Sequence, residues 1–279
     1  MKIEQLMRPD LQDEYGILKL QNIILNIMKY IHDLCDKHQI QYYVIGGTAL
    51  GAVRHGGFIP WDDDLDIAMT RDNYDKFIQV CQDELDPNEF YLQVGRKDWP
   101  LYFSKLRLKG TLFDEEGVGD EIAEENRGIF IDIFPFDATS NNRIVRYWQY
   151  FCSRLLVANA VGSRGYKTNS LCKKMVILMT KPLNNKLIRD FFYYQTIKYN
   201  SKKTKYFGDL FDCFRLRDAS WPQEIWGTPT KVIFETLELY APASILEYLK
   251  EYYGNYQELP SEDNRVPRHL ECINYGVYK

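Results

Sequence analysis

The chain contains Ile45-Gly46-Gly47-Thr48 and, after a gap of twelve residues, Trp61-Asp62-Asp63-Asp64-Leu65-Asp66-Ile67. Acidic and apolar residues alternate from Asp64 onward, as in a strand with one buried face, and residues i and i+2 of a strand lie on the same face roughly 7 Å apart. We therefore expect the carboxylates of Asp64 and Asp66 to lie side by side. Two such carboxylates repel each other unless a cation neutralises them, and Mg²⁺ takes oxygen ligands and keeps substrate phosphates in its shell. The segment predicts a site for Mg²⁺ or Mn²⁺.

A third acid fits the same site. Asp132 stands between Ile131 and Ile133, a pattern typical of a buried strand. Burying an isolated carboxylate is costly unless it is paired or bound to a metal. Asp132 is therefore a candidate ligand for the same cation, and the alternative is an acid that pairs with an arginine or caps a turn.

Gly46 and Gly47 stand where a short β-rich run ends and a helix is expected to open at Thr48. At such a junction, backbone N–H groups and the positive end of the helix can approach a phosphate closely. The pair is not part of a Walker A loop, because no Gly-Lys-Ser/Thr follows it. The glycine pair indicates a phosphate site only in combination with the acids that follow it along the chain.

Other sites based on these acids and on the histidines or cysteines do not fit. An EF-hand loop starting at Asp62 would need Gly at position 67 and Glu at position 73, where the chain has Ile67 and Asn73. The four histidines form no ligand pair of known spacing, no Gly-x-Ser-x-Gly is present, and the six cysteines include no Cys-x-x-Cys pair. These absences disfavour a histidine-metal hydrolase, a serine hydrolase and a structural zinc site.

The periodicity of apolar residues predicts a mixed α/β part followed by a mostly helical part, with a boundary near residue 140. This gives an α/β (α+β) fold class and two parts, residues 1–140 and 141–279. The acid-rich run 114–125 is expected to be a solvated loop, and residues after 136 to be helical. Helices are predicted at 14–38 and 70–82, and strands at 42–45, 64–69, 91–94, 102–108 and 129–134.

Charge is unevenly distributed. The 279 residues carry a net charge of −4, yet the segment Arg143–Lys205 holds fourteen Lys and Arg against one acid, Asp190, with many aromatic residues among them. These residues could form solvated basic helix faces or a surface for anionic lipid headgroups. No nucleic-acid-binding module accompanies the charge, so we expect no nucleic-acid partner. The sequence has no apolar stretch long enough to span a membrane and begins without an apolar signal region. We therefore expect a cytoplasmic protein, peripheral at the inner face of the membrane.

Three motifs resemble the LicD family, which includes phosphocholine transferases and is related to fukutin-related ribitol-phosphate transferases. The most specific is the twenty-two-residue run Gly46–Ile67. Phe130-Ile131-Asp132-Ile133-Phe134-Pro135 resembles the middle motif of the family, and Tyr253–Pro260, with Arg265 and His269 beyond it, resembles the closing motif. The resemblance implies a nucleotidyltransferase-like fold. It also implies that Asp64 and Asp66 hold the metal and that Asp132, the third acid, ligates a second metal or takes the proton from the acceptor hydroxyl. Asp62 would join the site through a water or by contacting the ligands from outside.

The reaction implied by the resemblance is transfer of a phospho-alcohol. A sugar hydroxyl attacks the phosphorus that bears the alcohol in a donor such as CDP-choline, and CMP leaves. The acceptor would be a cell-surface glycan precursor, plausibly lipid-linked. If choline is the alcohol, Trp61 is the expected aromatic contact for its quaternary ammonium. The full set of expected substrate contacts is Gly46, Gly47, Thr48, Arg54, Lys105, Arg107, Trp61 and His269.

Two other functions stay open at this point. A nucleotidylyltransferase of the same fold would attach the nucleotide and release pyrophosphate. A catalytically inert scaffold at the membrane surface is the other, and retention of three buried acids argues against it. For Arg54, Lys105 and Arg107, an ordinary ion pair is the alternative to a phosphate contact.

Overall fold

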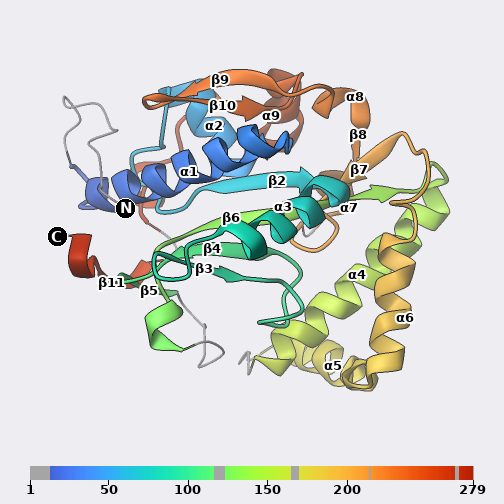
Figure 1. Cartoon of the computed structure of the whole chain (residues 1–279). Helices are drawn as coiled ribbons and strands as arrows, with labels where there is room; N and C mark the ends of the chain where they lie inside the picture. Colours follow the sequence, from blue (N-terminus) through green and yellow to red (C-terminus); the bar gives the residue numbers. More distant parts are fainter. Residues whose placement is uncertain (1–12, 116–122, 165–169, 214, 268–269, 279) are drawn as a thin grey trace.

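A seven-stranded mixed sheet forms the centre of the molecule, in a computed structural model that describes residues 13–115, 123–164, 170–213, 215–267 and 270–278 (Figure 1). The sheet runs β1-β2-β6-β4-β3, β7 pairs with β6, and β8 pairs with β7. Strands β2 and β6 are parallel, and the other neighbours are antiparallel. The bounds are β1 (Tyr43–Val44), β2 (Asp66–Thr70), β3 (Phe90–Gln93), β4 (Ser104–Leu108), β6 (Phe130–Thr139), β7 (Tyr206–Gly208) and β8 (Trp221–Pro222).

Three helices pack around this sheet. Helix α1 (Leu18–His38) contacts β6, and α3 (Arg71–Glu84) contacts both β2 and β6. Helix α2 (Gly46–His55) lies against β2 and against the later elements β9 and α9. The apolar stripe of α1 is fully buried, and each such side chain stabilises the fold by about 1.5–3 kcal/mol. The helices thereby fix β2 and β6, the strands that carry the acids.

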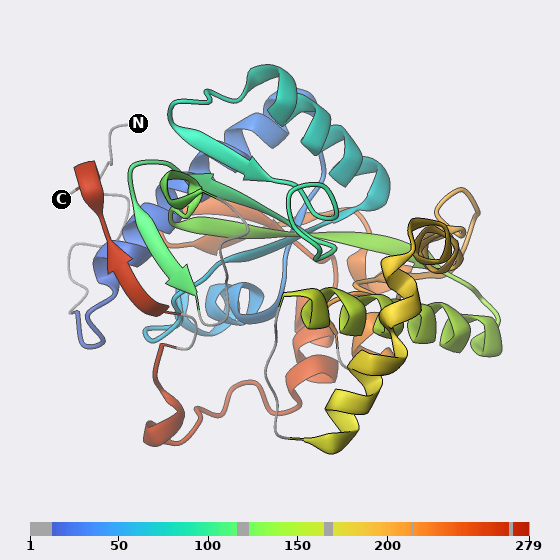
Figure 2. The ribbon, with the colours of Figure 1, turned by 90° about the horizontal axis from the view of Figure 1, so that it is seen from below.

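Helices α4 (Arg143–Ser163), α5 (Leu171–Met179) and α6 (Lys186–Ile197) form a helical arm that extends away from the sheet (Figures 1 and 2). Helix α4 begins at Asn142, whose side chain accepts hydrogen bonds from the N–H groups of Ile144 and Val145. Asn185 caps α6 in the same way. The arm has its own small apolar core, separate from the main one, formed by Tyr102, Leu156, Ala160, Leu183, Leu210, Phe211 and Ala219.

The last eighty residues return to the main body. The hairpin β9 (Thr230–Phe234) and β10 (Leu237–Ala241) packs on β1 and α2, and its apolar residues belong to the main core. Strand β11 (Leu270–Asn274) pairs with β5 (Leu112–Glu115). Three short helices complete this part: α7 (Leu216–Ala219), α8 (Gln223–Trp226) and α9 (Ile245–Tyr253). Among the described residues, no helix has both the length and the apolar character needed to cross a bilayer.

The mixed α/β fold class predicted from the sequence is confirmed, with four local corrections. Strand β2 begins at Asp66, so Asp64 lies in the preceding loop. Gly46 and Gly47 form the first turn of α2 instead of a turn before it. Strand β6 continues through Pro135, which sits between the end of the pairing with β4 and the start of that with β7, where its missing N–H costs little. Part of the expected acidic loop is strand β5, while residues 116–122 lie outside the described residues.

The strands after residue 200 were not anticipated. Strands β7 and β8 have three and two residues and carry almost no periodicity, whereas β9, β10 and β11 have five residues each, and alternation such as that of Leu237–Ala241 was not used in the sequence analysis. The proposed division at residue 140 stays a prediction. Strand β6, which ends at Thr139, leads directly into the helical arm through the cap residue Asn142.

Candidate active site

The parallel pair β2 and β6 places two of the predicted acids opposite each other. Asp66 and Asp132 are register partners, and neighbouring strands lie about 4.8 Å apart. Burial raises the pKa of Asp66 well above its usual range, and the carboxylates of Asp64, Asp132, Asp62 and Asp212 raise it further. The structure therefore brings Asp64 close enough to Asp66 for their charges to interact, although Asp64 is not part of the strand.

The loop before β2 gathers three consecutive carboxylates. One oxygen each from Asp62, Asp63 and Asp64 lies within 4.8 Å of the others. The loop is fixed by Gln21 of α1, whose amide Nε2 donates to the backbone oxygens of Ile59 (3.2 Å) and Asp62 (2.9 Å). Asp63 was not among the predicted ligands, because its position between two acids gave no indication that it is buried.

These donors fit a hard divalent cation. All are carboxylate oxygens, the ligands that Mg²⁺ and Mn²⁺ prefer, and no histidine or cysteine belongs to the cluster of described residues. The side chains of Asp62, Asp64 and Asp132 are half-buried and that of Asp212 is exposed, and together they raise the pKa of Asp66; a positive charge among them would offset their repulsion. Among the described residues, the cluster of ligand oxygens holds Asp62, Asp63 and Asp64 and does not include Asp66 or Asp132. Asp62, Asp64, Asp66 and Asp132 stay the proposed ligands, and Asp63 joins them as a further candidate.

The two glycines allow the start of α2 to approach the acids. A Cβ on Gly46 would lie 3.6 Å from Oδ2 of Asp66, and one on Gly47 would lie 2.7 Å from Oδ2 of Asp62, a distance that forces a rearrangement. Gly46 also has a φ of +53°, which disfavours any other residue. The helix N-terminus and the carboxylates therefore share one small space, as a metal–phosphate site requires.

Two of the predicted phosphate contacts are already engaged within the protein. The N–H of Gly46 donates to the hydroxyl of Tyr248 at 3.0 Å. The buried hydroxyl of Thr48 accepts a hydrogen bond from the N–H of Asp66 at 2.8 Å. Thr48 thus positions the backbone of Asp66. The N–H of Gly47 remains the proposed phosphate donor.

Lys105 pairs directly with Asp132. The two residues are register partners on β4 and β6, and Nζ of Lys105 lies 2.9 Å from Oδ1 and 3.2 Å from Oδ2 of Asp132. Only 3% of the Lys105 side chain and 13% of the Asp132 side chain are exposed, and the ammonium lies 3.4 Å from the centre of the Phe130 ring. Asp132 is therefore paired with a cation, the alternative that the sequence left open, and the cation is a lysine instead of an arginine.

Arg107 lies two residues further along β4, inside the sheet. Its side chain is buried and donates to Oε1 of Gln93 at 2.8 Å and to the carbonyl of Gly128 at 3.2 Å. A phosphate in solvent contact cannot reach a guanidinium held in this way. These contacts correct the sequence-based proposal for Arg107, which is a structural cation in this conformation.

The segment 253–260 closes one side of the acid loop. Arg54 donates from Nη1 to the carbonyls of Tyr256 (3.0 Å) and Glu258 (3.3 Å), and its partial burial lowers the pKa of the guanidinium. The ring of Trp61 has the guanidinium of Arg265 5.7 Å from its centre and packs edge-on against His55. His269, also predicted from the sequence, lies outside the described residues.

Two acids near the site were missed. Asp209 and Asp212 follow β7, and the charge of Asp212 helps to raise the pKa of Asp66. Burial raises the pKa of Asp209 to about 7, and its carboxylate accepts hydrogen bonds from the N–H groups of Phe211 and Asp212. Their signal was the reappearance of acids directly after the long basic segment, which the sequence analysis did not use.

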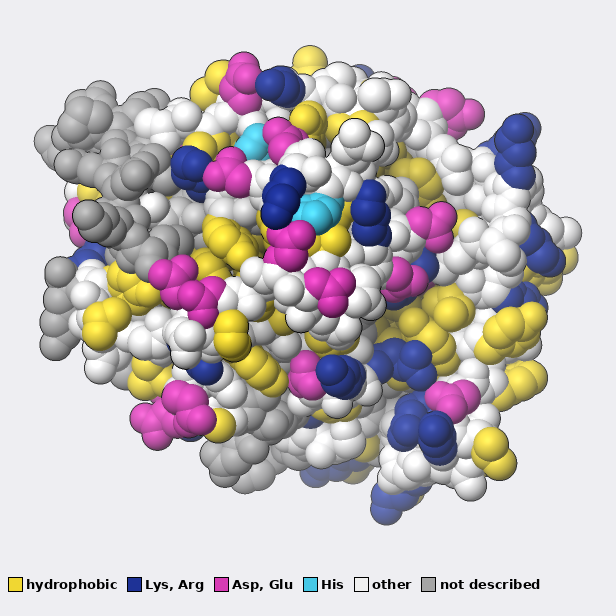
Figure 3. Space-filling model, in the orientation of Figure 1, with side chains coloured by type: hydrophobic (Ala, Val, Ile, Leu, Met, Phe, Trp, Pro, Cys, Tyr) yellow, Lys and Arg dark blue, Asp and Glu magenta, His cyan; other side chains and the backbone are white. Residues whose placement is uncertain are grey.

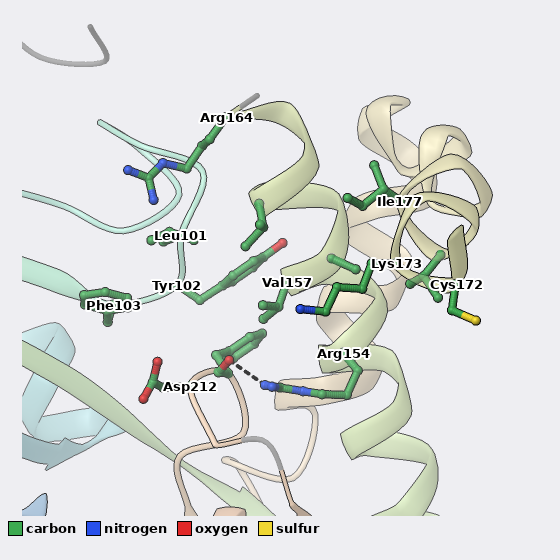
Figure 4. Close-up of a pocket in the computed structure, with 14 residues that line it drawn as sticks. Leu101, Tyr102, Phe103, Arg154, Val157, Arg164, Cys172, Lys173, Ile177 and Asp212 are labelled. Carbon is green, nitrogen blue, oxygen red and sulfur yellow. Dashed lines mark hydrogen bonds between the residues drawn. The ribbon is translucent and has the colours of Figure 1, made fainter. Parts of the chain in front are cut away.

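An apolar cavity of about 630 Å³ opens between the loop 101–103, the helices α4 and α5, and the loop 211–212 (Figure 4). Tyr102 and Phe211 stack at 4.3 Å within its wall. Arg154 is held by the carbonyls of Leu210 and Phe211, and Lys173 points from α5 into the cavity. Asp212 lines the cavity, and its charge is one of those that raise the pKa of Asp66.

A mixed sheet with acids on adjacent parallel strands, beside a helix that begins with two glycines, defines a nucleotidyltransferase-type fold. Comparison with known proteins agrees. Residues 39–155 match the family model described as "LicD/FKTN/FKRP, nucleotidyltransferase domain". The chain is 30% identical over 256 residues to the "Lipopolysaccharide cholinephosphotransferase LicD" of Haemophilus influenzae, covering 90% of this chain and 95% of that protein. The chain belongs to the LicD family.

A more distant relative is "Ribitol 5-phosphate transferase FKRP" of Mus musculus. It is 24% identical over 111 residues, which cover 39% of this chain and 19% of that protein. The human protein of the same name is 39% identical over 41 residues, 15% of this chain and 8% of its own length. The names of these relatives refer to the transfer of two different phospho-alcohols, choline phosphate and ribitol phosphate.

Proposed function

We propose that this protein is a metal-dependent phosphotransferase that moves a phospho-alcohol, phosphocholine from CDP-choline, to a sugar hydroxyl of a cell-surface glycan precursor. Membership of the LicD family supports phosphotransfer as the reaction, and the choline phosphate named for the relative aligned over most of both chains supports the alcohol. The structural observation that carries the proposal is Asp66, a half-buried acid beside the start of α2 whose pKa is raised by desolvation and by four neighbouring carboxylates.

In this proposal, Asp62, Asp64, Asp66 and Asp132 hold Mg²⁺ or Mn²⁺. The bound metal supplies positive charge that neutralises the donor diphosphate and the departing CMP. The N–H of Gly47 and the N-terminus of α2 orient the phosphate oxygens. Lys105 lies 2.9 Å from Oδ1 of Asp132, and this ion pair occupies the carboxylate, which makes Asp132 the less suitable proton acceptor.

Asp212 is the proposed general base. It borders both the acid cluster and the apolar cavity, so an acceptor whose apolar part lies in the cavity would present its hydroxyl near this carboxylate. Asp132 was the sequence-based candidate for this step, and its pairing with Lys105 makes it the weaker one.

Trp61 is the proposed contact for the quaternary ammonium of choline. Its ring lies beside the acid loop, and the guanidinium of Arg265 lies 5.7 Å from the ring centre, a distance at which a cation is attracted by an aromatic face.

The direct test is to incubate the purified protein with Mg²⁺ and, separately, CDP-choline, CDP-ribitol and CDP-glycerol, and to measure CMP and pyrophosphate. Release of CMP from CDP-choline in preference to the other donors supports the proposal, and Asp66→Asn provides the inactive control. Preference for another donor would keep the reaction class and change the alcohol. Pyrophosphate formed from CTP and a phospho-alcohol would indicate a nucleotidylyltransferase instead. Absence of any nucleotide product from all donors, with acceptor present, would leave the inert scaffold.

A further inference from the structure

The helical arm exposes an unusual concentration of apolar side chains. Of nineteen large apolar residues exposed among the described parts of the chain, thirteen lie between positions 144 and 194. We call them the apolar face of the arm: Ile144, Tyr147, Trp148, Phe151, Leu171, Met175, Val176, Leu178, Met179, Leu187, Ile188, Phe191 and Tyr194. Helix α4 contacts both α5 and α6, so these residues lie on neighbouring helices. A concentration of exposed apolar residues on one part of the surface marks an interaction surface, whereas single exposed apolar residues are ordinary.

Helix α5 is the extreme case, because none of its nine residues is buried. Leu171 and Met179, at its two ends, are each 74% exposed. The helix contacts α4 at a close approach where a Cβ on Gly162 would lie 2.6 Å from a methyl group of Ile177. A helix this short is marginal in water without packing, so a further surface is needed to cover it.

The charge of the arm indicates the chemistry of that surface. Fourteen Lys and Arg and one acid lie in segment 143–205, while the rest of the chain carries a net charge of −17. Figure 3 shows Lys, Arg and apolar side chains intermingled over the arm, and Lys173, Lys174, Lys181 and Lys186 are all exposed. The partner must therefore combine a negatively charged surface with an apolar interior that the exposed side chains can enter. Basic residues mixed with exposed leucine, methionine and aromatic side chains are the composition of helices that lie in a membrane interface.

The same helix links this face to the active site. Residues Cys172, Lys173, Val176 and Ile177 of α5 form one wall of the apolar cavity, whose far wall includes Asp212 (Figure 4). The docking face and the cavity therefore share helix α5.

We propose that the apolar face of the arm docks on an anionic lipid bilayer. The docking depends on apolar side chains that enter the interface and on lysines that contact lipid headgroups. The attraction of the lysines acts over about 8 Å at physiological salt, so binding weakens as salt rises.

The test is cosedimentation with vesicles of phosphatidylglycerol or of phosphatidylcholine at 0.15 M salt. We expect binding to the anionic vesicles only. Lys173→Glu with Lys174→Glu should weaken it at least tenfold, and so should Leu178→Ser with Met179→Ser. Two controls match these changes elsewhere on the surface: Lys231→Glu with Lys250→Glu for charge, and Leu246→Ser with Val277→Ser for apolar character. Both controls should bind within twofold of the unchanged protein.

A label on Cys172 reports where the surface lies. Cys172 is exposed, Cys35, Cys81 and Cys152 are buried, and Cys213 is half-buried. In a Cys213→Ser, Cys272→Ser background, an environment-sensitive fluorophore therefore attaches at Cys172. Its emission should shift to the blue with anionic vesicles, and a label on Lys231→Cys should not shift. An unshifted Cys172 label on bound protein would overturn the proposal, because docking would then use another surface.

Three further outcomes would also overturn it. Equal binding to both vesicles, or binding to neither, excludes an anionic bilayer. A dimer in solution that Lys173→Glu with Lys174→Glu dissociates, without vesicle binding, would assign the face to a second copy of the chain. CMP release from CDP-choline in vesicle-free solution is measured in parallel. If the original protein releases no CMP, the proposed function is refuted, whereas the result on vesicle binding stays valid.

Discussion

The sharpest prediction concerns Asp66 and can be tested without any substrate. In the metal-free protein, Asp66→Asn removes one charge from a buried cluster in which burial and four carboxylates already raise the pKa of Asp66. Because the pKa of the folded protein is higher than that of the unfolded chain, the contribution of Asp66 to stability is present at low pH and is lost as pH rises through the folded-state pKa. At pH 7.5 the Asp66→Asn protein should therefore unfold at a higher temperature than the metal-free original.

Added Mg²⁺ should reverse that order. A ligand that binds only the folded state, at one hundred times its dissociation constant, stabilises it by about 2.7 kcal/mol. For a protein of this size, that corresponds to an increase in Tm of about 5–10 °C. Asp66→Asn removes a ligand, so its Tm should rise by less than about 2 °C at the same Mg²⁺ concentration. Turnover should fall about a thousandfold or more, because several kcal/mol of transition-state stabilisation are lost.

The assay is thermal unfolding with and without Mg²⁺ at several pH values. The matched control is Asp83→Asn, which changes an exposed acid in the last turn of α3. The control should behave like the original protein in every condition. An unchanged Mg²⁺-dependent increase in Tm in Asp66→Asn would refute the reasoning, because the cation would then bind elsewhere. A lower metal-free Tm would show that Asp66 stabilises the fold despite its neighbours.

Three other predictions follow from single contacts. Lys105→Met leaves Asp132 nearly buried without its cation, so denaturant unfolding should show a loss of about 3 kcal/mol, and adding Asp132→Asn should restore part of it. Trp61→Leu should raise KM for CDP-choline about 2- to 30-fold, the range of a cation–π contact, and should leave KM for CDP-glycerol unchanged. Burial raises the pKa of Asp209 to about 7, so stability should fall as pH rises from about 4 to 8, by up to roughly 4 kcal/mol. Asp209→Asn should flatten that dependence in urea titrations at each pH, and an unaltered slope would assign it to another group.

The strands that carry Asp66 and Asp132 were predictable from their apolar pattern. The expected pair of Asp64 and Asp66 on one strand was not found, because β2 begins at Asp66. That Asp132 lies opposite Asp66 depends on the register of β2 with β6, which only the structure shows. The register that pairs Lys105 with Asp132 could not be predicted, because it depends on how β4 aligns with β6. Arg107 illustrates the same limit. Basic residues two positions apart on a strand share a face, yet one reaches an acid of the site and the other is enclosed by Gln93 and Gly128.

Residues that act on the site from distant parts of the chain were the least predictable. Asp212 and Tyr248 come from the last third of the chain, and only the folded structure shows that one interacts with Asp66 and the other holds the N–H of Gly46. Periodicity reports which face of an element is buried, and it contains no information about which remote element covers that face.

Some contacts of this site join residues about two hundred positions apart, so the site is completed late in the synthesis and folding of each chain. Gly46 is held by Tyr248, and Arg54 by the carbonyls of Tyr256 and Glu258. A ribosome-bound chain that has exposed all the acids but not yet residue 258 therefore has the metal ligands without the contacts that fix their surroundings. Contacts so distant in sequence also form slowly. On the proposed function, transfer from an activated donor would therefore require the closing segment 253–260 to be in place, which ties the onset of activity to completion of the fold.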